Sequence, residues 1–364
     1  MAAESTDACR LDLAELERPA LEVALVERGH QRFHARQIFQ WLYRRGITDP
    51  AAMTDLSRDL RAALANGCTL STPEVVHREK SIDGTEKFLL RLDDSRTIEA
   101  VFIPDTPSMT FCISTQVGCA MACAFCLTGK MGLVRNLTAG EIVGQVRVLA
   151  DALQMRGARF NIVLMGMGEP LHNYDETMKA LRILADEHGF AMSPRRITLS
   201  TVGLLPALEK LAREPVMPNL AISLHAPTDA QRGELVPINR KYGVSDIIEA
   251  CKRFPLKRRN RITFEYVLLA GINDRPEDAR RLAKLLAGVK SKVNLIPLNV
   301  AAGIPFDRPS DQAVDRFAQI LADRHLTVSV RKSRGRDIRA ACGQLIVEGQ
   351  KKSAGQQLAT LAFR

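Results

Sequence analysis

From residue 109 onward, short β-rich runs alternate with amphipathic segments, and this alternation restricts the fold more than any other feature. The β-rich runs are MTFCIS, FNIVLM, RRITLST, NLAISLH, RITFEYVLL, KVNLIPLN and LTVSVRKS. Segments with helical spacing of apolar residues lie between most of them, including TAGEIVGQVRVLADALQ, SDIIEACKRF, PEDARRLAKLLAG and DQAVDRFAQILADR. The pattern predicts an α/β fold with a parallel sheet, and six or seven units suit a full or partial (β/α) barrel.

The first 80 residues have a different pattern. HARQIFQWLYRRG and DPAAMTDLSRDLRAALANG have apolar residues at helical spacing and end at Gly46 and Gly67, which predicts a small helical module. Its basic residues near Trp41 and Tyr43 suit either a solvated face or RNA contact; they are Arg28, Arg32, Arg36, Arg44 and Arg45. KFLLRLDDSRTIEAVFI predicts a β-hairpin. The expected domains are therefore 1–80 (helical), 81–108 (hairpin linker), 109–345 (barrel) and 346–364 (tail).

Composition narrows the class of protein. The 364-residue chain has eight cysteines and a formal net charge of +10. The excess of Lys and Arg suits a polyanionic partner such as nucleic acid, although many basic proteins bind none. With no apolar run of membrane-spanning length and no signal peptide, the cytoplasm is the expected compartment. Cysteines in that reducing compartment favour metal or catalytic chemistry over structural disulfides.

Polar residues follow several of the predicted strands. Where a barrel strand ends, such residues are candidates for an active site. The candidates here are Gly168, Glu169, Ser200, Ser223, His225 and Asn299. Taken alone, a Gly-Glu-Pro sequence is usually a turn and a single histidine is usually part of the core.

Three cysteines stand close together in GCAMACAFCLTG, with the spacing Cys-x3-Cys-x2-Cys. They are Cys119, Cys123 and Cys126. Zinc sites and iron–sulfur cubanes usually take four protein ligands. A cubane held by three thiolates leaves one iron open for a reactant, whereas a zinc site would need a distant Cys or His to complete it.

A Cys-x3-Cys-x2-Cys loop after the first strand of an α/β barrel resembles the radical S-adenosylmethionine (SAM) superfamily. The resemblance implies a [4Fe–4S] cluster whose open iron is chelated by the amino and carboxylate groups of SAM. It also implies that the reduced cluster cleaves SAM to a 5′-deoxyadenosyl radical. A flavodoxin or ferredoxin is then the expected electron donor.

Further motifs give a closer resemblance. FCISTQVGCAMACAFC, RNLTAGEIVGQV, MGMGEPLHN, ITLSTVG, AISLHAP, LVPINRKY, NLIPLN and VRKSRGRDIRAACGQL together resemble the dual-specificity RNA methyltransferases. That resemblance implies methylation of adenosine C2 in 23S rRNA, at the peptidyl transferase centre, and in tRNA beside the anticodon. It also implies two SAM molecules per turnover and a monomeric enzyme. Related enzymes methylate adenosine C8 and confer antibiotic resistance; overall likeness and the N-terminal module favour C2.

The same resemblance assigns roles to individual residues. Cys342 would carry the methyl group as S-methylcysteine, Cys112 would resolve a covalent RNA adduct by forming a transient disulfide, and Glu99 would accept a proton. The SAM-contacting positions would be Gly168, Glu169, Ser200, Ser223, Leu224, His225 and Asn299. Without the resemblance, Cys112 is usually a core residue and Glu99 a surface residue of a hairpin.

Two other classes of function share part of these features. A glycyl-radical activase or a peptide-modifying radical enzyme would have the cysteine loop but would not need Cys112 paired with Cys342. A zinc-dependent RNA-binding module would have the basic charge without catalysis. Two basic runs, KRFPLKRRNR and RKSRGRDIR, are candidates for phosphate contact in any RNA-binding protein.

Overall fold

The computed structural model describes residues 10–104 and 109–347, so most of the expected C-terminal tail lies outside the described residues. Its main sheet has ten strands in the order β14-β13-β12-β11-β10-β9-β6-β5-β4-β3. Within this sheet, the seven strands from β6 to β14 are mutually parallel. Their bounds are β6 Thr110–Cys112, β9 Asn161–Leu164, β10 Ile197–Thr201, β11 Asn219–Ser223, β12 Ile262–Leu268, β13 Ser291–Pro297 and β14 Thr327–Val330.

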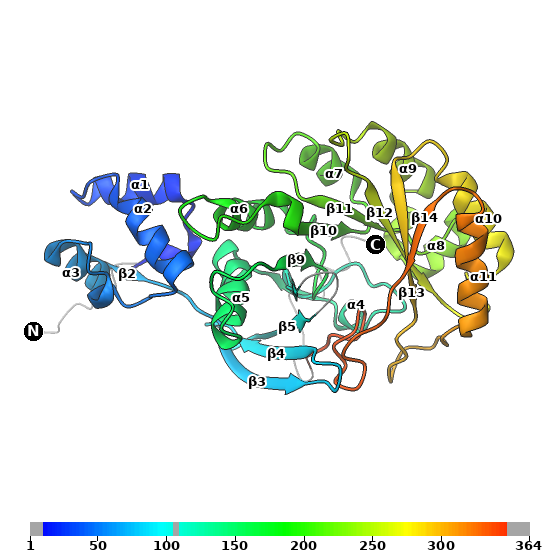
Figure 1. Cartoon of the computed structure of the whole chain (residues 1–364), viewed down its shortest axis with the longest axis horizontal. Helices are drawn as coiled ribbons and strands as arrows, with labels where there is room; N and C mark the ends of the chain where they lie inside the picture. The colour runs from blue at the N-terminus through cyan, green and yellow to red at the C-terminus, as the bar shows by residue number, and fades with distance from the viewer. Residues whose placement is uncertain (1–9, 105–108, 348–364) are drawn as a thin grey trace, which may run out of the picture.

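Helices connect successive parallel strands and cover the outside of the sheet (Figure 1). Their bounds are α5 Ala139–Ala152, α6 Tyr174–Ala185, α7 Leu205–Leu211, α8 Asp229–Leu235, α9 Val244–Arg253, α10 Pro276–Leu285 and α11 Asp311–Ala322. The parallel strands follow one another in chain order, and β14 forms one edge of the sheet. The predicted partial (β/α) barrel is therefore confirmed.

Antiparallel strands extend the sheet beyond β6. The predicted hairpin is present as β4 Glu86–Arg91 and β5 Thr97–Ile103, and β5 pairs with β6 so that Val101 lies opposite Cys112. A further strand, β3 Glu74–Lys80, pairs with β4. The expectation of helices throughout the first 80 residues is therefore wrong at this strand. EVVHREK is largely polar because β3 is an exposed edge strand, where charged residues prevent pairing with other chains.

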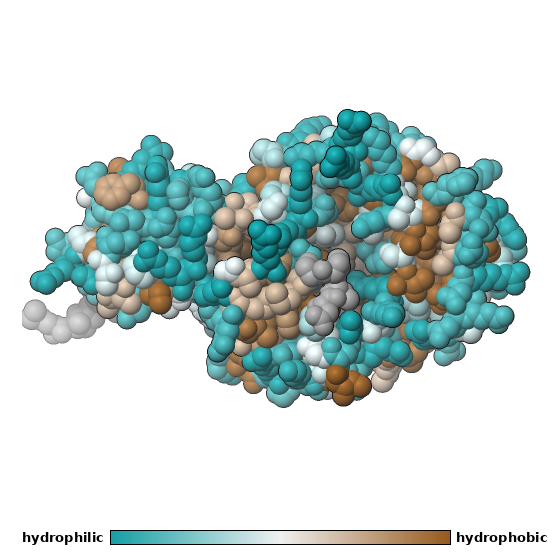
Figure 2. Space-filling model, in the orientation of Figure 1, coloured by the Kyte–Doolittle hydropathy of each residue, from teal (hydrophilic) through white to brown (hydrophobic). Residues whose placement is uncertain are grey.

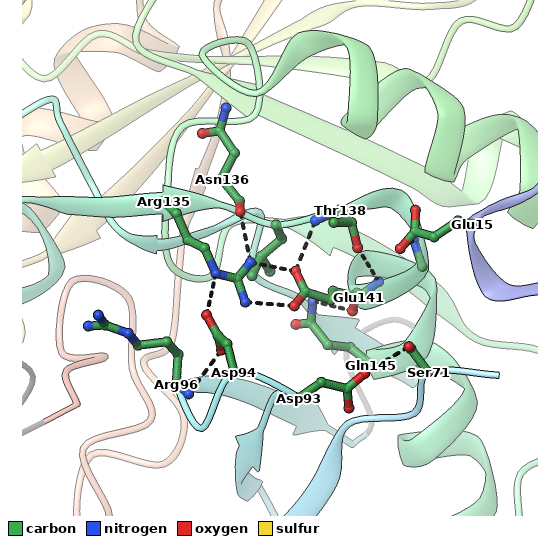
Figure 3. Close-up of polar contacts among 12 residues, drawn as sticks. Glu15, Ser71, Asp93, Asp94, Arg96, Arg135, Asn136, Thr138, Glu141 and Gln145 are labelled. Carbon is green, nitrogen blue, oxygen red and sulfur yellow. Dashed lines mark hydrogen bonds and ion pairs between the residues drawn. The ribbon is translucent and has the colours of Figure 1, made fainter. Parts of the chain in front are cut away.

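One arginine fastens the hairpin to the barrel (Figure 3). Arg135 lies on β8 Leu133–Asn136, which pairs with β7 Gln116–Gly118. Its guanidinium contacts Asp94 of the hairpin turn at 2.7 Å and both carboxylate oxygens of Glu141 at 2.7 and 2.8 Å. Glu141 also completes the predicted capping box with Thr138 at the start of α5. The bidentate pair fixes the orientation of the Arg135 guanidinium as well as its distance from Glu141.

The described part of the N-terminal module contains three α-helices and a small parallel ribbon. Its elements are β1 Leu11–Asp12, α1 Arg18–Glu27, α2 His34–Phe39, α3 Arg58–Gly67 and β2 Cys68–Thr69. A π-helical turn, Gln40–Arg45, continues α2 and ends at Gly46, whose φ of 73° suits glycine. The second predicted helix is broken: Pro50–Ala52 is a separate 3₁₀ turn, and Ser57 caps α3 by accepting from the Leu60 N–H.

The module packs against α5 and α6 of the barrel domain and forms a separate lobe in Figure 2. Arg18 of α1 contacts Asp186 at 2.9 Å, and Arg182 of α6 contacts Glu17 at 2.7 Å. Apolar side chains of the module and the barrel form one continuous core. Most residues of α5 are buried, because the sheet lies on one side of this helix and the module on the other.

A second, smaller apolar cluster lies around the cysteine loop, at the carboxyl ends of the parallel strands. It includes Phe125, Leu298 and Ile304. In the described part of the chain, every helix is too short or too polar to cross a bilayer.

Candidate active site

The cysteine loop connects β7 to the short helix α4, Leu127–Met131. Cys119 directly follows β7, and Cys126 directly precedes α4. Gly118 has a φ of 78°, and a Cβ at this position would lie 1.9 Å from the carbonyl oxygen of Gly132. Only glycine therefore permits the close approach of β7 and the end of α4 that fixes both ends of the loop.

The predicted residues at the strand ends gather around this loop. They line one cavity of about 150 Å³ together with all three cysteines. The predicted residues in the lining are Cys119, Cys123, Cys126, Gly168, Glu169, Ser200, Ser223, His225, Asn299 and Cys342. Leu224 does not line it: the Leu224 side chain is fully buried in the main core, and its N–H donates to the Glu265 carbonyl at 3.0 Å.

Glu169 is a buried carboxylate held by main-chain donors. Its oxygens accept from the N–H groups of Leu171 at 3.1 Å and Val202 at 2.9 Å. Burial nevertheless dominates and raises the pKa of Glu169 to about 7. Gly168, with a φ of 106°, lies so close to Gln116 that a Cβ would meet its side chain at 2.7 Å. Gly168 and Glu169 both line the cavity at this turn.

His225 and two serines form another side of the cavity. His225 Nδ1 accepts the Val267 N–H at 3.1 Å, and its ring meets Phe125 edge-on with centroids 4.8 Å apart. Burial lowers the pKa of His225 to about 3, so the ring is neutral. The hydroxyls of Ser200 and Ser223 are 3.2 Å apart and form a hydrogen bond. This side of the cavity offers neutral polar groups to a ligand.

Burial raises the pKa of each thiol in the cysteine loop. Without a bound cation these thiols are protonated at neutral pH, and a metal cluster would hold them as thiolates. Within the described ranges, 10–104 and 109–347, no three His, Cys, Asp or Glu side chains converge as ligands of a single metal ion. Cluster-binding cysteines attach to different irons and need no such single point. Three cysteines around one cavity thus fit the predicted cluster.

Cys342 lies where this cavity meets a second one of about 630 Å³, which runs along the inside of the sheet. The second cavity also contains Cys112 of β6. Burial, with a smaller contribution from the neighbouring Cys342, raises the pKa of Cys112 to about 12. The structure thus places both predicted reactive thiols on the larger cavity, and Cys342 also on the cavity around the cysteine loop.

Arg331 and Glu265 also line both cavities, and the sequence analysis missed them. The pKa of the Arg331 guanidinium is raised chiefly by the Cys342 sulfur, with burial opposing. The positive charge of Arg331 also opposes part of the rise in the pKa of Cys112. Glu265 accepts from the Asn294 side chain at 2.7 Å, and its own pKa is raised by burial. Glu265 lies on β12 and Arg331 directly follows β14, and only the curvature of the sheet brings both to the cavities, so the sequence held no local signal for them.

Glu99, like Leu224, is a predicted site residue that lies outside both cavity linings. It is 5% exposed on β5 and is absent from the lining of both cavities. Its carboxylate contacts Lys87 at 3.3 Å and accepts the Ile346 N–H at 2.8 Å. Its predicted role as a proton acceptor stays a prediction.

Comparison with known proteins agrees with this arrangement. Residues 113–284 match the radical SAM superfamily, and residues 11–70 match the ribosomal RNA large subunit methyltransferase N-terminal domain. A radical SAM methyltransferase from Sphaerobacter thermophilus has a similar structure, with a TM-score of 0.88 and 48% identity over 92% of this chain and 99% of that one. The fold and site therefore define a radical SAM methyltransferase.

Individual curated relatives define the activity more closely. The dual-specificity RNA methyltransferase RlmN of Geobacter sulfurreducens is 51% identical over 92% of both chains. The protein of the same name from Anaeromyxobacter dehalogenans is 48% identical over 93% of this chain and 92% of its own. The chain belongs to the RlmN family of dual-specificity RNA methyltransferases. As a member it is a SAM-dependent enzyme with one [4Fe–4S] cluster, and it uses two SAM molecules per turnover.

Proposed function

We propose that this enzyme methylates C2 of adenosine in 23S rRNA and in tRNA, through S-methylcysteine at Cys342 and a transient disulfide with Cys112. The observation that carries the proposal is the position of Cys342. Its side chain lines both the cavity around the cysteine loop and the larger cavity that contains Cys112. A methyl group on this sulfur would therefore be accessible to the cofactors in the first cavity and to a substrate base in the larger cavity.

The cofactors would be held by the first cavity. The three loop thiols are the proposed cluster ligands. The proposed SAM contacts in the cavity lining are Gly168, Glu169, Ser200, Ser223, His225 and Asn299. Leu224 would contribute through its main chain, since its side chain belongs to the core. When bound, the cluster and SAM supply a methyl group and a hydrogen-abstracting radical. A ligand ammonium group is a suitable partner for the buried Glu169 carboxylate.

The chain's own residues would then carry the carbon. Cys342 holds the transferred carbon as a thioether. Loss of one hydrogen atom from that group leaves a carbon radical that adds to C2. The adduct then loses its C2 proton to Cys112 and one electron, which the cluster would accept. Once ionised again, the Cys112 sulfur attacks the Cys342 sulfur, forming an S–S bond as the S–C bond breaks and the bonding electrons stay on the carbon. The released carbon gains a proton and becomes the methyl group. Thiol–disulfide chemistry of this kind needs a thiolate near its partner, and Arg331 favours the ionised form of Cys112.

RNA would reach Cys342 through the larger cavity. Basic side chains line its wall and mouth, including Arg195, Arg196, Lys292, Lys332 and Arg334. Cationic groups at a cavity entrance attract a phosphate backbone, and the target adenosine must leave its stack to enter. We further propose a monomeric, cytoplasmic enzyme reduced by a flavodoxin or ferredoxin.

The test is an anaerobic assay of the reconstituted enzyme on 23S rRNA fragments and tRNA, followed by mass spectrometry of nucleosides. We expect 2-methyladenosine from both RNAs. Formation of 8-methyladenosine instead would favour the C8 alternative, and absence of any methylated adenosine would contradict the proposal.

A further inference from the structure

The surroundings of Glu99 point to a role different from proton transfer. In the β5–β6 pair, Val101 lies opposite Cys112, so Glu99 is on the same face of the sheet as Cys112 and two residues farther along. Despite this closeness, Glu99 does not line either cavity. The carboxylate that lines both is Glu265. A base must come within hydrogen-bond reach of the proton that it removes, and the residues that line the two cavities do not include Glu99.

Both oxygens of the Glu99 carboxylate already have donors. Oε1 is 3.3 Å from Lys87 Nζ on β4, and Oε2 accepts the main-chain N–H of Ile346 at 2.8 Å. Burial raises the pKa of Glu99, while Lys87 and the Ile346 N–H lower it. Proton acceptance would weaken both interactions in a buried site, where unpaired polar groups are costly.

Ile346 belongs to the segment that carries Cys342. From Lys332 to the end of the described chain, this segment contains no helix or strand. Hydrogen bonds from other parts of the barrel hold it in place. Near Cys342 these are Asn299 Nδ2 to the Cys342 carbonyl (3.2 Å), the Leu127 N–H to the Gly343 carbonyl (2.9 Å), Thr128 Oγ1 to the Leu345 carbonyl (2.6 Å) and Gln344 Nε2 to the Val300 carbonyl (3.0 Å).

Glu99 differs from these anchors in one respect. The other four bonds are made to carbonyls of the segment or by a Gln344 amide, whereas Glu99 is the carboxylate in this set. A hydrogen bond to a charged group is about twice as strong as a neutral one. Glu99 also connects the segment to the β4–β5 hairpin, while the other bonds connect it to α4 and to the residues that follow β13.

We propose that Glu99 is a positioning residue, which anchors the main chain of Ile346 and so places the Cys342 sulfur between the two cavities. The inference rests on the proposed function, because it assigns the anchor to the thiol that would carry the methyl group. Glu99 then needs only an acceptor oxygen at Ile346 and needs no basicity. This requirement separates the role from that of a proton acceptor.

The test compares Glu99→Gln with Glu99→Ala in the reconstituted holoenzyme. Glutamine keeps an acceptor oxygen within reach of Ile346 but is not a base, and Lys87 retains Glu79 as a partner at 3.4 Å. The measurements are the fraction of Cys342 methylated, by peptide mass spectrometry, and the ratio of 5′-deoxyadenosine released to RNA methylated. Glu79→Gln is the matched control, since it removes the other carboxylate near Lys87 and leaves Ile346 anchored.

We expect Glu99→Gln to retain RNA methylation within about threefold of wild type. For Glu99→Ala we expect SAM cleavage to continue. The ratio of 5′-deoxyadenosine to methylated RNA should rise about tenfold or more in this variant, because a hydrogen bond to a charged group is lost. Normal methylation of Cys342 by Glu99→Gln with a loss of RNA turnover of about 100-fold or more would overturn the inference, because that is the effect of losing a base. A wild-type ratio in Glu99→Ala would overturn it too. Failure of the wild type to methylate Cys342 would be distinguishable and would overturn the proposed function itself.

Discussion

Arg232 of α8 holds the ends of two strands at the cofactor cavity, and its removal should weaken both the fold and SAM binding. Its side chain is fully buried. The guanidinium donates to the carbonyls of Leu224 at 3.0 Å, Val202 at 2.6 Å and Ser223 at 3.2 Å. It also donates to the Asn239 side chain at 2.9 Å. Burial lowers the pKa of Arg232 to about 10, so it still carries its charge at neutral pH.

Arg232→Met would leave these four acceptors without their donor. Each lost bond costs about 1 kcal/mol, and removal of a buried charge returns part of that cost, so we expect about 3 kcal/mol of destabilisation. An unfolding entropy of about 2.1 cal/mol/K per residue then gives a fall in Tm of about 4 °C for a chain of this length. The assay is calorimetry of the apoprotein under anaerobic conditions, with SAM affinity measured separately on the reconstituted enzyme.

Arg280→Met on α10 is the matched control. Arg280 and its partner Glu277, 2.9 Å away, are both exposed, and such surface pairs contribute at most about 1 kcal/mol. The control should therefore change the Tm by about 1 °C or less and leave SAM affinity unchanged. Equal Tm values for Arg232→Met and wild type, or equal SAM affinities, would refute the view that this arginine sets the strand ends.

Three further predictions concern the cluster, RNA binding and pH. Replacing all three loop cysteines with alanine should remove the iron–sulfur absorption and SAM cleavage together; iron retained by that variant would contradict the ligand assignment. Glutamate at the exposed Arg36, Arg44 and Arg45 should weaken RNA affinity and reduce its salt dependence, with SAM cleavage in the absence of RNA unchanged; unaltered RNA binding would make the module purely structural. Resolution of a preformed RNA adduct should accelerate about tenfold per pH unit between about pH 6.5 and 8.5, because a thiol with a pKa of about 12 is ionised in direct proportion to hydroxide over that range; a plateau near neutrality, seen in single-turnover RNA release, would contradict this.

Local sequence patterns predicted most of the barrel. Each β-rich run forms a strand in the structure. These runs were recognisable because strands buried on both faces of a parallel sheet are continuously apolar over a short stretch of sequence. β3 was missed because Glu74–Lys80 is polar and its strand conformation depends on pairing with β4. The broken helix at Pro50–Ala52 was missed because the apolar spacing continues across the break.

The candidate site shows a similar division. The spacing of the cysteine loop and the polar residues at strand ends were visible in the sequence, and the structure places them around one cavity. Arg331 and Glu265 were not visible, because only curvature of the sheet brings β12 and β14 to face β6. In the N-terminal module, Trp41 and Tyr43 are buried in the core, whereas the nearby basic residues Arg44 and Arg45 are exposed.

The central claim is that Cys342 carries the methyl group and Cys112 releases the product, and a denaturing gel with labelled RNA tests it most directly. Wild type, Cys112→Ala and Cys342→Ala are reconstituted anaerobically and supplied with SAM, a reductant and RNA. The account predicts a covalent enzyme–RNA species that accumulates in Cys112→Ala alone, with Cys342 methylated in that variant before RNA is added. An adduct formed by Cys342→Ala, or normal turnover by Cys112→Ala, would contradict it.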